Sequence, residues 1–244
     1  MTRLLTLILV LGVFVTCQAS VSAQKGKTPP KSSTPKAAST NKPSTNKPST
    51  VVAVNQSLKS LSTYEKQLFD EINYARANPQ EYLKALELFR RNYRGKEIHY
   101  PEGDVLVTDE GVAAIDEAID FVRKLKPLQP LDLRNGMVKA AKVHVEDLVS
   151  SGKDGHRGSD GSQPGQRLDR FGRWNEAYGE NIVYESRTPR YDVIGMIIDD
   201  GTANRGHREN LFAEDFRVMG VAAGKRPGGA TVGVVTFAVG YTDK

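Results

Sequence analysis

Cysteine is nearly absent from this sequence. The only one in 244 residues, Cys17, lies in an N-terminal stretch that resembles an export signal. Arg3 supplies a positive start, residues 4–15 form an apolar run too short to span a bilayer, and residues 21–23 (VSA) form a small-residue cleavage site. We therefore expect residues 1–23 to be a signal peptide and the protein to be secreted, either extracellular or periplasmic. The residues before Cys17 fit a lipoprotein box poorly, so lipid anchoring there is the less favoured alternative.

Without Cys17 the mature chain can form no disulfide, so its core alone must stabilise it. Residues 24–57 contribute little to such a core, because they are rich in Lys, Pro, Ser and Thr and hold few apolar side chains. We expect this segment to be a disordered tether. No other long apolar run follows the signal, so no transmembrane segment is expected in the mature chain.

Acidic residues are missing from the N-terminal part, and this absence explains the formal net charge of +5. Of the 34 basic residues, seven lie before residue 58, which leaves 27 basic and 29 acidic residues and a charge of −2 for the rest. A nucleic-acid role is therefore not expected for the folded part. The basic tether could contact an anionic envelope surface, or it could be a solvated spacer.

Residues 58–244 are expected to form one domain. Helix signals appear at Ser62, which is followed by Glu65 in a capping box, and at Pro79, which can open the next helix. Apolar residues at helical spacing predict two more helices, one from Val112 to Pro127 and one from Met137 to Gly152. The pair Thr188-Pro189 opens another, which we expect to run to Gly201.

Strand signals gather near the C-terminus. The runs RVMGVAAG and TVGVVTFAVGY are rich in β-branched residues and are separated by KRPGG, which predicts an antiparallel hairpin. ENIVYE is a third candidate strand. Helices combined with a few antiparallel strands indicate an α+β sandwich.

Three segments place a polar side chain between glycines, and we expect each to be a turn: GHRGSDG with His156, YGENIVY with Glu180, and RGHRENLF with His207. Two imidazoles and a carboxylate suit a divalent-metal site or an acid/base pair with an orienting group. No two of them have the four-residue spacing of a helical zinc motif. Three unrelated surface turns are the alternative.

The chain contains, in this order, the segments INYARANPQEY, AAKVHVEDL, GHRGSDGSQPGQRL, YGENIVY and MIIDDGTANRGHRENLF. In these segments it resembles the CAP superfamily, which includes cysteine-rich secretory proteins, antigens and pathogenesis-related proteins, and it looks like the cysteine-free bacterial branch. The resemblance implies a three-layer α-β-α sandwich with a small antiparallel sheet and a cleft that carries two histidines and acidic residues. By motif, His156 and His207 match the two histidines and Glu180 the acid of GENI.

The fourth cleft position departs from the family pattern. Many members place a further glutamate on the helix before the second histidine, whereas this chain offers Asp199 and Asp200. Acidic residues at the end of a helix meet the negative end of its dipole, so we expect a partner among Arg205, His207 and Arg208. The alternative is that both aspartates are exposed. The segment 93–125 is longer than expected for the family.

Arg205 and Arg208 disfavour the charged form of His207, whereas Glu180 would favour it. A neutral imidazole can bind a metal. We therefore expect the arginines to turn outward to acidic partners, while His156, His207 and Glu180 hold a divalent cation, zinc first, with water completing the shell.

The function expected from these features is a secreted binding or interaction module whose ligand is a lipid, a cell-wall glycan or a protein. The alternative is a cation-assisted hydrolase of an envelope or extracellular substrate, with Glu180 as base. No G-x-S-x-G elbow supports a serine nucleophile. Of the remaining candidates, we expect His144 to be a core residue, His99 a surface residue, and Trp174 to pack on the sandwich or rim the cleft.

Overall fold

The computed structural model describes residues 59–244. The predicted signal peptide (1–23), the predicted tether (24–57) and Leu58 lie outside the described residues. In chain order the elements are α2 (Thr63–Ala77), α3 (Pro79–Phe89), the 3-10 turn η1 (Arg90–Asn92), β1 (Tyr93–Arg94), β2 (Glu97–His99), β3 (Val105–Val107), α4 (Val112–Arg123), β4 (Asp132–Leu133), α5 (Asn135–Ser151), α6 (Pro164–Phe171), β5 (Gly172–Val183), α7 (Pro189–Ile198), α8 (Gly206–Phe212), β6 (Val218–Lys225) and β7 (Thr231–Asp243).

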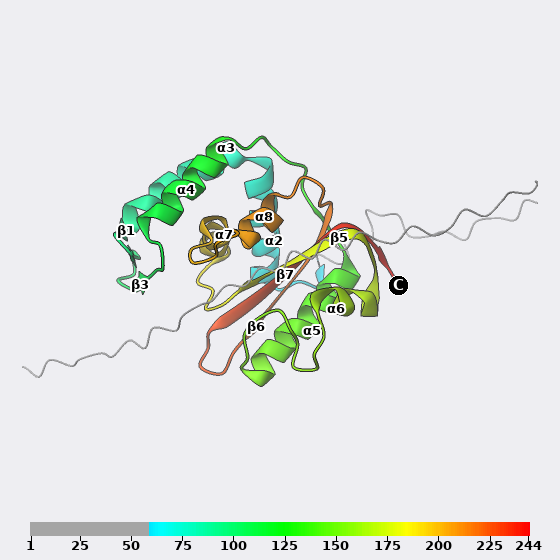
Figure 1. The fold of residues 1–244 in the computed structure, drawn as a ribbon. Coiled ribbons are helices and arrows are strands. Elements are labelled where there is room, and N and C mark those ends of the chain that lie inside the picture. Colours follow the sequence, from blue (N-terminus) through cyan, green and yellow to red (C-terminus); the bar gives the residue numbers. More distant parts are fainter. Residues whose placement is uncertain (1–58) are drawn as a thin grey trace, which may run out of the picture.

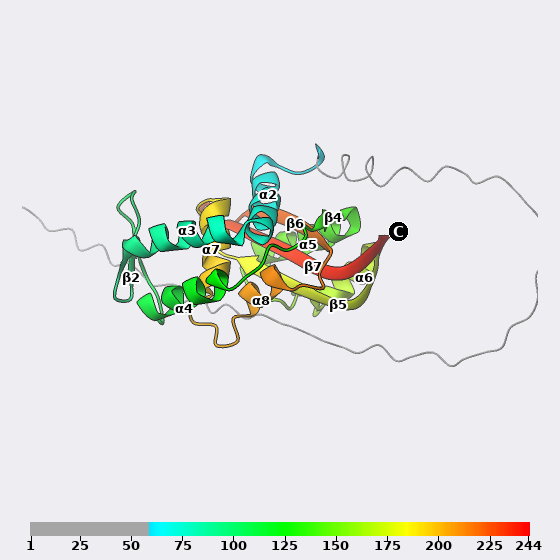
Figure 2. The ribbon, with the colours of Figure 1, turned by 90° about the horizontal axis from the view of Figure 1, so that it is seen from above.

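The elements form three layers, so the predicted α-β-α sandwich is confirmed. A four-stranded sheet of order β4-β6-β7-β5 stands in the middle, with α5 and α6 on one face and α2, α7 and α8 on the other (Figures 1 and 2). β6 and β7 form the predicted hairpin, in which Val218 pairs with Ala238 and Lys225 with Thr231. β5 pairs antiparallel with β7, and the short β4 runs parallel to β6.

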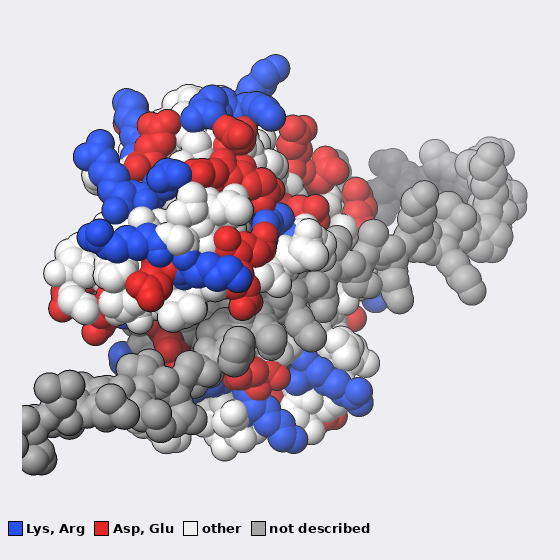
Figure 3. All heavy atoms as spheres, turned by 60° about the vertical axis from the view of Figure 1, so that its left-hand side comes forward, with Lys and Arg blue, Asp and Glu red and all other residues white. Residues whose placement is uncertain are grey.

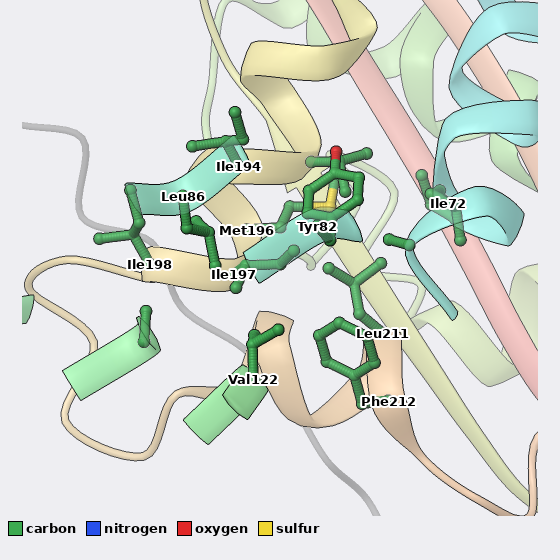
Figure 4. Packing of buried hydrophobic residues seen from close by; sticks show 14 of the residues in the cluster. Ile72, Tyr82, Leu86, Val122, Ile194, Met196, Ile197, Ile198, Leu211 and Phe212 are labelled. Atoms are coloured by element: carbon green, nitrogen blue, oxygen red, sulfur yellow. The ribbon is translucent and has the colours of Figure 1, made fainter. Parts of the chain in front are cut away.

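The larger core lies between the sheet and the helices α2, α3, α4, α7 and α8. Helix α7 runs through its centre, and its side chains Ile194, Met196, Ile197 and Ile198 are surrounded by α3, α4 and α8 (Figure 4). On the other face of the sheet, smaller apolar clusters join α5 and α6 to the strands. A helix buried on most sides holds its C-terminal end in a fixed place, and that end leads to His207.

Local signals placed most helices correctly. Ser62 caps α2 and Glu65 completes the capping box, as the S-x-x-E pattern predicts. Pro79 occupies the first turn of α3, and Thr188 caps α7 through the backbone N–H of Tyr191. The helix expected to reach Gly201 ends at Ile198, because Asp199 adopts a left-handed conformation with φ of 53°.

Two of the three expected glycine-flanked turns are wrong. Glu180 lies within strand β5, and His207 lies in the first turn of helix α8. Gly179 is needed for close approach instead, because a Cβ there would come within 3.0 Å of the Asn210 side chain on α8. His156 does lie in an irregular segment between α5 and α6.

The segment 93–125 forms an extension of the domain. It contains the three-stranded sheet β1-β2-β3 and helix α4, which packs beside α3 (Figure 1). The sequence signals missed this small sheet as well as β4 and α6. These strands have two or three residues each, too few for an alternating pattern to stand out.

Gly220 of β6 lies directly against α5. A Cβ there would come within 3.0 Å of backbone atoms of Met137 and Val138, which cannot rotate away. We predict that Gly220→Ala lowers the free energy of unfolding by about 1–3 kcal/mol through overpacking. Urea denaturation measures this. Gly195→Ala is the matched control, because nothing lies within 4 Å of a Cβ at that position of α7; equal losses in both variants would contradict the packing argument.

The surface of the described part mixes charges of both signs. On the face with β1, β3 and α4, Lys and Arg alternate with Asp and Glu, and neither sign forms a continuous patch (Figure 3). Among residues 59–244, no helix has the length and apolar character needed to cross a bilayer.

Candidate functional site

Glu180 is the centre of a buried polar cluster. It is 1% exposed, and strand β5 carries it between α5 and the segment before α6. His156 Nδ1 lies 2.9 Å from Glu180 Oε1, and Arg167 Nη2 donates to both carboxylate oxygens at 2.9 Å. Arg167, on α6, also donates to the backbone carbonyls of His156 and Ser162. One guanidinium therefore ties the carboxylate to the His156 loop.

Glu180 carries its charge despite complete burial. Burial raises the pKa of its carboxyl group, but the hydrogen bond from His156 and the positive charge of Arg167 outweigh that effect, so its pKa lies below the usual value. The pKa of the His144 imidazole, on α5, is also lowered, in this case because burial disfavours its charged form. Its Nε2 lies 3.0 Å from the carbonyl of Gly155, and it is fully buried, as expected of a core histidine.

His207 forms a second pair, with Asp199. His207 Nδ1 lies 2.7 Å from Asp199 Oδ1, and the backbone N–H of His207 donates to Oδ2 at 2.8 Å. Both side chains are 1% exposed. Asp199 is the C-cap of α7. The pair therefore joins the end of α7 to the start of α8, the connection that the sequence analysis expected.

Asp200 serves a different part of the fold. Its carboxylate accepts the backbone N–H groups of residues 109, 110 and 111 at 2.6–3.0 Å, just before α4. The two neighbouring aspartates therefore hold different elements in place.

Two asparagines connect the two histidine pairs. Asn181, next to Glu180 on β5, donates to the backbone carbonyl of His207 at 3.0 Å. Asn210 of α8 donates to the side-chain oxygen of Asn181 at 2.8 Å and reaches the backbone carbonyl of Glu180 at 3.5 Å. The Glu180 strand and the His207 helix are thus held side by side by buried amides.

The two arginines beside His207 have acidic partners, as expected. Arg205 binds Glu110 and Glu117, and Arg208 binds Glu117 at 2.7 Å. Arg208 does not turn outward, since it is 2% exposed and donates to the last carbonyls of α7. Both glutamates belong to the long 93–125 segment, which therefore supports the His207 helix from outside.

The expected site residues thus fall into two sets. The structure brings His156 to Glu180 and His207 to Asp199, and the buried amides of Asn181 and Asn210 lie between them. Within the described part of the chain, no group of three or more His, Cys, Asp or Glu side chains could hold a metal ion. Arg167 and both asparagines could not be predicted, because no sequence pattern separates a buried arginine or asparagine from the exposed majority.

Two of the solved structures that this chain resembles have low similarity to it. An outer surface protein from Borrelia burgdorferi is 20% identical, with a TM-score of 0.41 over 53% of this chain and 89% of that protein. An extracellular protein containing a SCP domain from Bacillus anthracis str. Ames is also 20% identical, with a TM-score of 0.35 over 52% of this chain and 37% of the other. A search of curated proteins finds no match.

The family comparison is more extensive. The model of the cysteine-rich secretory protein family, CAP, matches residues 69–241, which include both histidine pairs and most of the central sheet. The resemblance noted in the sequence motifs is therefore confirmed over most of the described domain. This chain belongs to the CAP family of cysteine-rich secretory proteins.

Proposed function

We propose that this protein is a binding module that works outside the cytoplasm, and that it is not a hydrolase. The proposal rests on the burial and the hydrogen bonds of the two carboxylates next to the imidazoles. Glu180 and Asp199 are both buried, and each already accepts hydrogen bonds from neighbouring groups of the chain. The location outside the cytoplasm rests on the signal-like residues 1–23.

A hydrolase at this site would need Glu180 as its base. A base must reach the proton that it removes, and both Glu180 oxygens accept hydrogen bonds from Arg167. The pKa of Glu180 also lies below its usual value, whereas a base that works near neutral pH needs a raised one. These two observations favour binding over catalysis.

Of the three expected cation ligands, we propose that only the two histidines bind the cation directly. Glu180 does not fit as a ligand, because Arg167 and His156 already use its oxygens. His156 and His207 are the better candidates, since each turns Nδ1 toward a carboxylate, as histidines that bind a metal through Nε2 do. We therefore propose that the two imidazoles hold a cation such as zinc, with water or a bound ligand completing its shell, and that Glu180 and Asp199 orient them.

We predict that zinc binding requires both histidines. Isothermal titration should give a saturable heat with the unaltered protein and none with the His156→Ala/His207→Ala double variant. His99→Ala is the matched control, because this histidine lies in β2 beside Glu97 and should not affect the heat. Equal heats from the unaltered protein and the double variant would refute the cation proposal. If the protein still binds envelope material in the absence of zinc, the proposal of a binding module holds even though the cation proposal fails.

A further inference from the structure

A pocket of about 410 Å³ lies at the end of the central sheet near the C-terminus, and its lining, from the first residues of β5 and β6 and the last residues of β7, includes neither histidine pair. We propose that it binds a phosphoryl group carried by a small polar molecule. Three arginines line it, Arg134, Arg173 and Arg217, together with a single carboxylate, Asp132.

The three arginines reach this pocket from separate parts of the chain. Arg134 is the N-cap of α5, directly after β4, and Arg217 directly precedes β6. Arg173 is the second residue of β5 and pairs with Thr242 of β7. The parallel pairing of β4 with β6 brings the first two together. The three arginines therefore meet because of the sheet topology, and no local sequence motif predicts that they do.

The positive charge of the pocket is poorly neutralised. The side chain of Arg173 is exposed, and its guanidinium makes no hydrogen bond or ion pair with any residue from 59 to 244. Arg217 donates through Nη1 to the backbone carbonyls of Glu214 and Phe216, which carry no charge. Arg134 Nη2 lies 3.5 Å from Asp132 Oδ2, and within the described residues this is the only ion pair among the four lining charges. The lining therefore keeps a net charge of +2.

Arg134 also leaves a donor unused. Its Nε is buried and has no hydrogen-bond partner in the described part of the chain. A buried N–H without an acceptor is unfavourable, and a rotation of the Arg134 side chain toward an oxyanion in the pocket would supply the acceptor. As the N-cap of the 17-residue helix α5, Arg134 also lies at the positive end of a helix dipole, which further favours an anion.

The neutral part of the lining combines the apolar side chains of Val218, Val239 and Tyr241 with two polar ones. Asn175 comes from β5 and Thr242 from β7, and neither side chain makes a hydrogen bond within residues 59–244. Gly240 leaves space for the Asn175 side chain, because a Cβ at position 240 would come within 3.0 Å of it. Three guanidinium groups match the oxygens of a tetrahedral phosphate better than those of a planar carboxylate, which one arginine can satisfy.

Isothermal titration of the purified protein with sn-glycerol 3-phosphate tests this proposal, with inorganic phosphate and acetate as further ligands at constant salt. We expect the phosphomonoester to bind with a Kd below about 1 mM, and acetate to show no binding at that concentration. The Arg134→Gln/Arg173→Gln variant should lose at least about tenfold in affinity, because it removes two charged donors. Binding of inorganic phosphate alone would also support the phosphoryl assignment, with the organic part then making no contribution.

Arg94→Gln/Lys96→Gln is the matched control, since both residues are exposed on the β1–β2 hairpin and the change in net charge is the same. It should bind like the unaltered protein. Thermal unfolding of each variant confirms that it is folded before titration. The proposal is overturned by absence of binding of either phosphate up to about 10 mM, by equal binding of acetate, or by equal losses in the two double variants.

Discussion

Replacing Arg167 with methionine is expected to lower the free energy of unfolding by about 3–5 kcal/mol, the usual cost of leaving a buried charge without its partner. Arg167 is 1% exposed and holds both oxygens of Glu180 together with the backbone of the His156 loop. Urea denaturation at pH 7 measures the change.

Arg170→Met is the matched control, because Arg170 lies on the same helix but forms an exposed pair with Asp160. We expect a loss of less than about 1 kcal/mol there. The Arg167→Met/Glu180→Leu double variant removes both charges and should regain most of the lost stability. A loss below about 1 kcal/mol for Arg167→Met alone would show that the cluster contributes little to stability.

The contribution of Glu180 should also depend on pH. Its pKa is lower in the folded than in the unfolded protein, so its stabilisation is fully present above the unfolded value of about 4.3 and is lost as pH falls through the folded value. The difference between the unaltered protein and Arg167→Met should therefore be large at pH 7 and should shrink below about pH 4. A difference that is constant over this range would contradict the assignment of a charged Glu180.

Asp199→Ala is expected to lower the free energy of unfolding by about 3 kcal/mol, because it removes the two short hydrogen bonds from His207 to a charged acceptor and places alanine at a positive φ. Asp199 binds the ring and the backbone N–H of His207, and its own φ is 53°. In NMR spectra, the His207 Nδ1–H proton should exchange with water much faster in the variant.

Asp200→Ala separates this effect from a general loss of acidic charge. The Asp200 carboxylate accepts backbone N–H groups before α4, so we expect a loss of about 1 kcal/mol, as for a helix cap, and an unchanged His207 signal. If the two variants disturb His207 equally, Asp199 has no special role in orienting it.

Much of the fold follows from short-range signals in the sequence. The capping box at Ser62, the prolines that open α3 and α7, and the β-branched hairpin all depend on residues close together in the chain, and they appear where predicted. The motifs also identified the histidines and Glu180 as residues of interest. They could not assign partners, since Arg167 reaches Glu180 from α6, a short helix that the sequence signals missed.

The glycines beside Glu180 and His207 show why the backbone conformation of the site could not be predicted from neighbouring residues alone. Flanking glycines led us to expect turns at Glu180 and His207, because left-handed backbone is the commonest reason for glycine. In the structure Gly179 has a different purpose, which is to let α8 approach β5 within reach of Asn210. A close approach between distant elements requires glycine, and so does a turn, so only the tertiary structure distinguishes the two reasons.

By itself the sequence determined most of the helices, the three longer strands of the central sheet, their order, the family and the titratable groups available, because each of these rests on periodicity, caps or contiguous motifs. Tertiary structure alone decided which charges meet. It paired Glu180 with Arg167 and His156, Asp199 with His207, and Glu117 with Arg208. It also placed three arginines together at one end of the sheet. These pairings depend on how helices and strands pack through their apolar faces, and a buried charge takes the partner that packing places beside it.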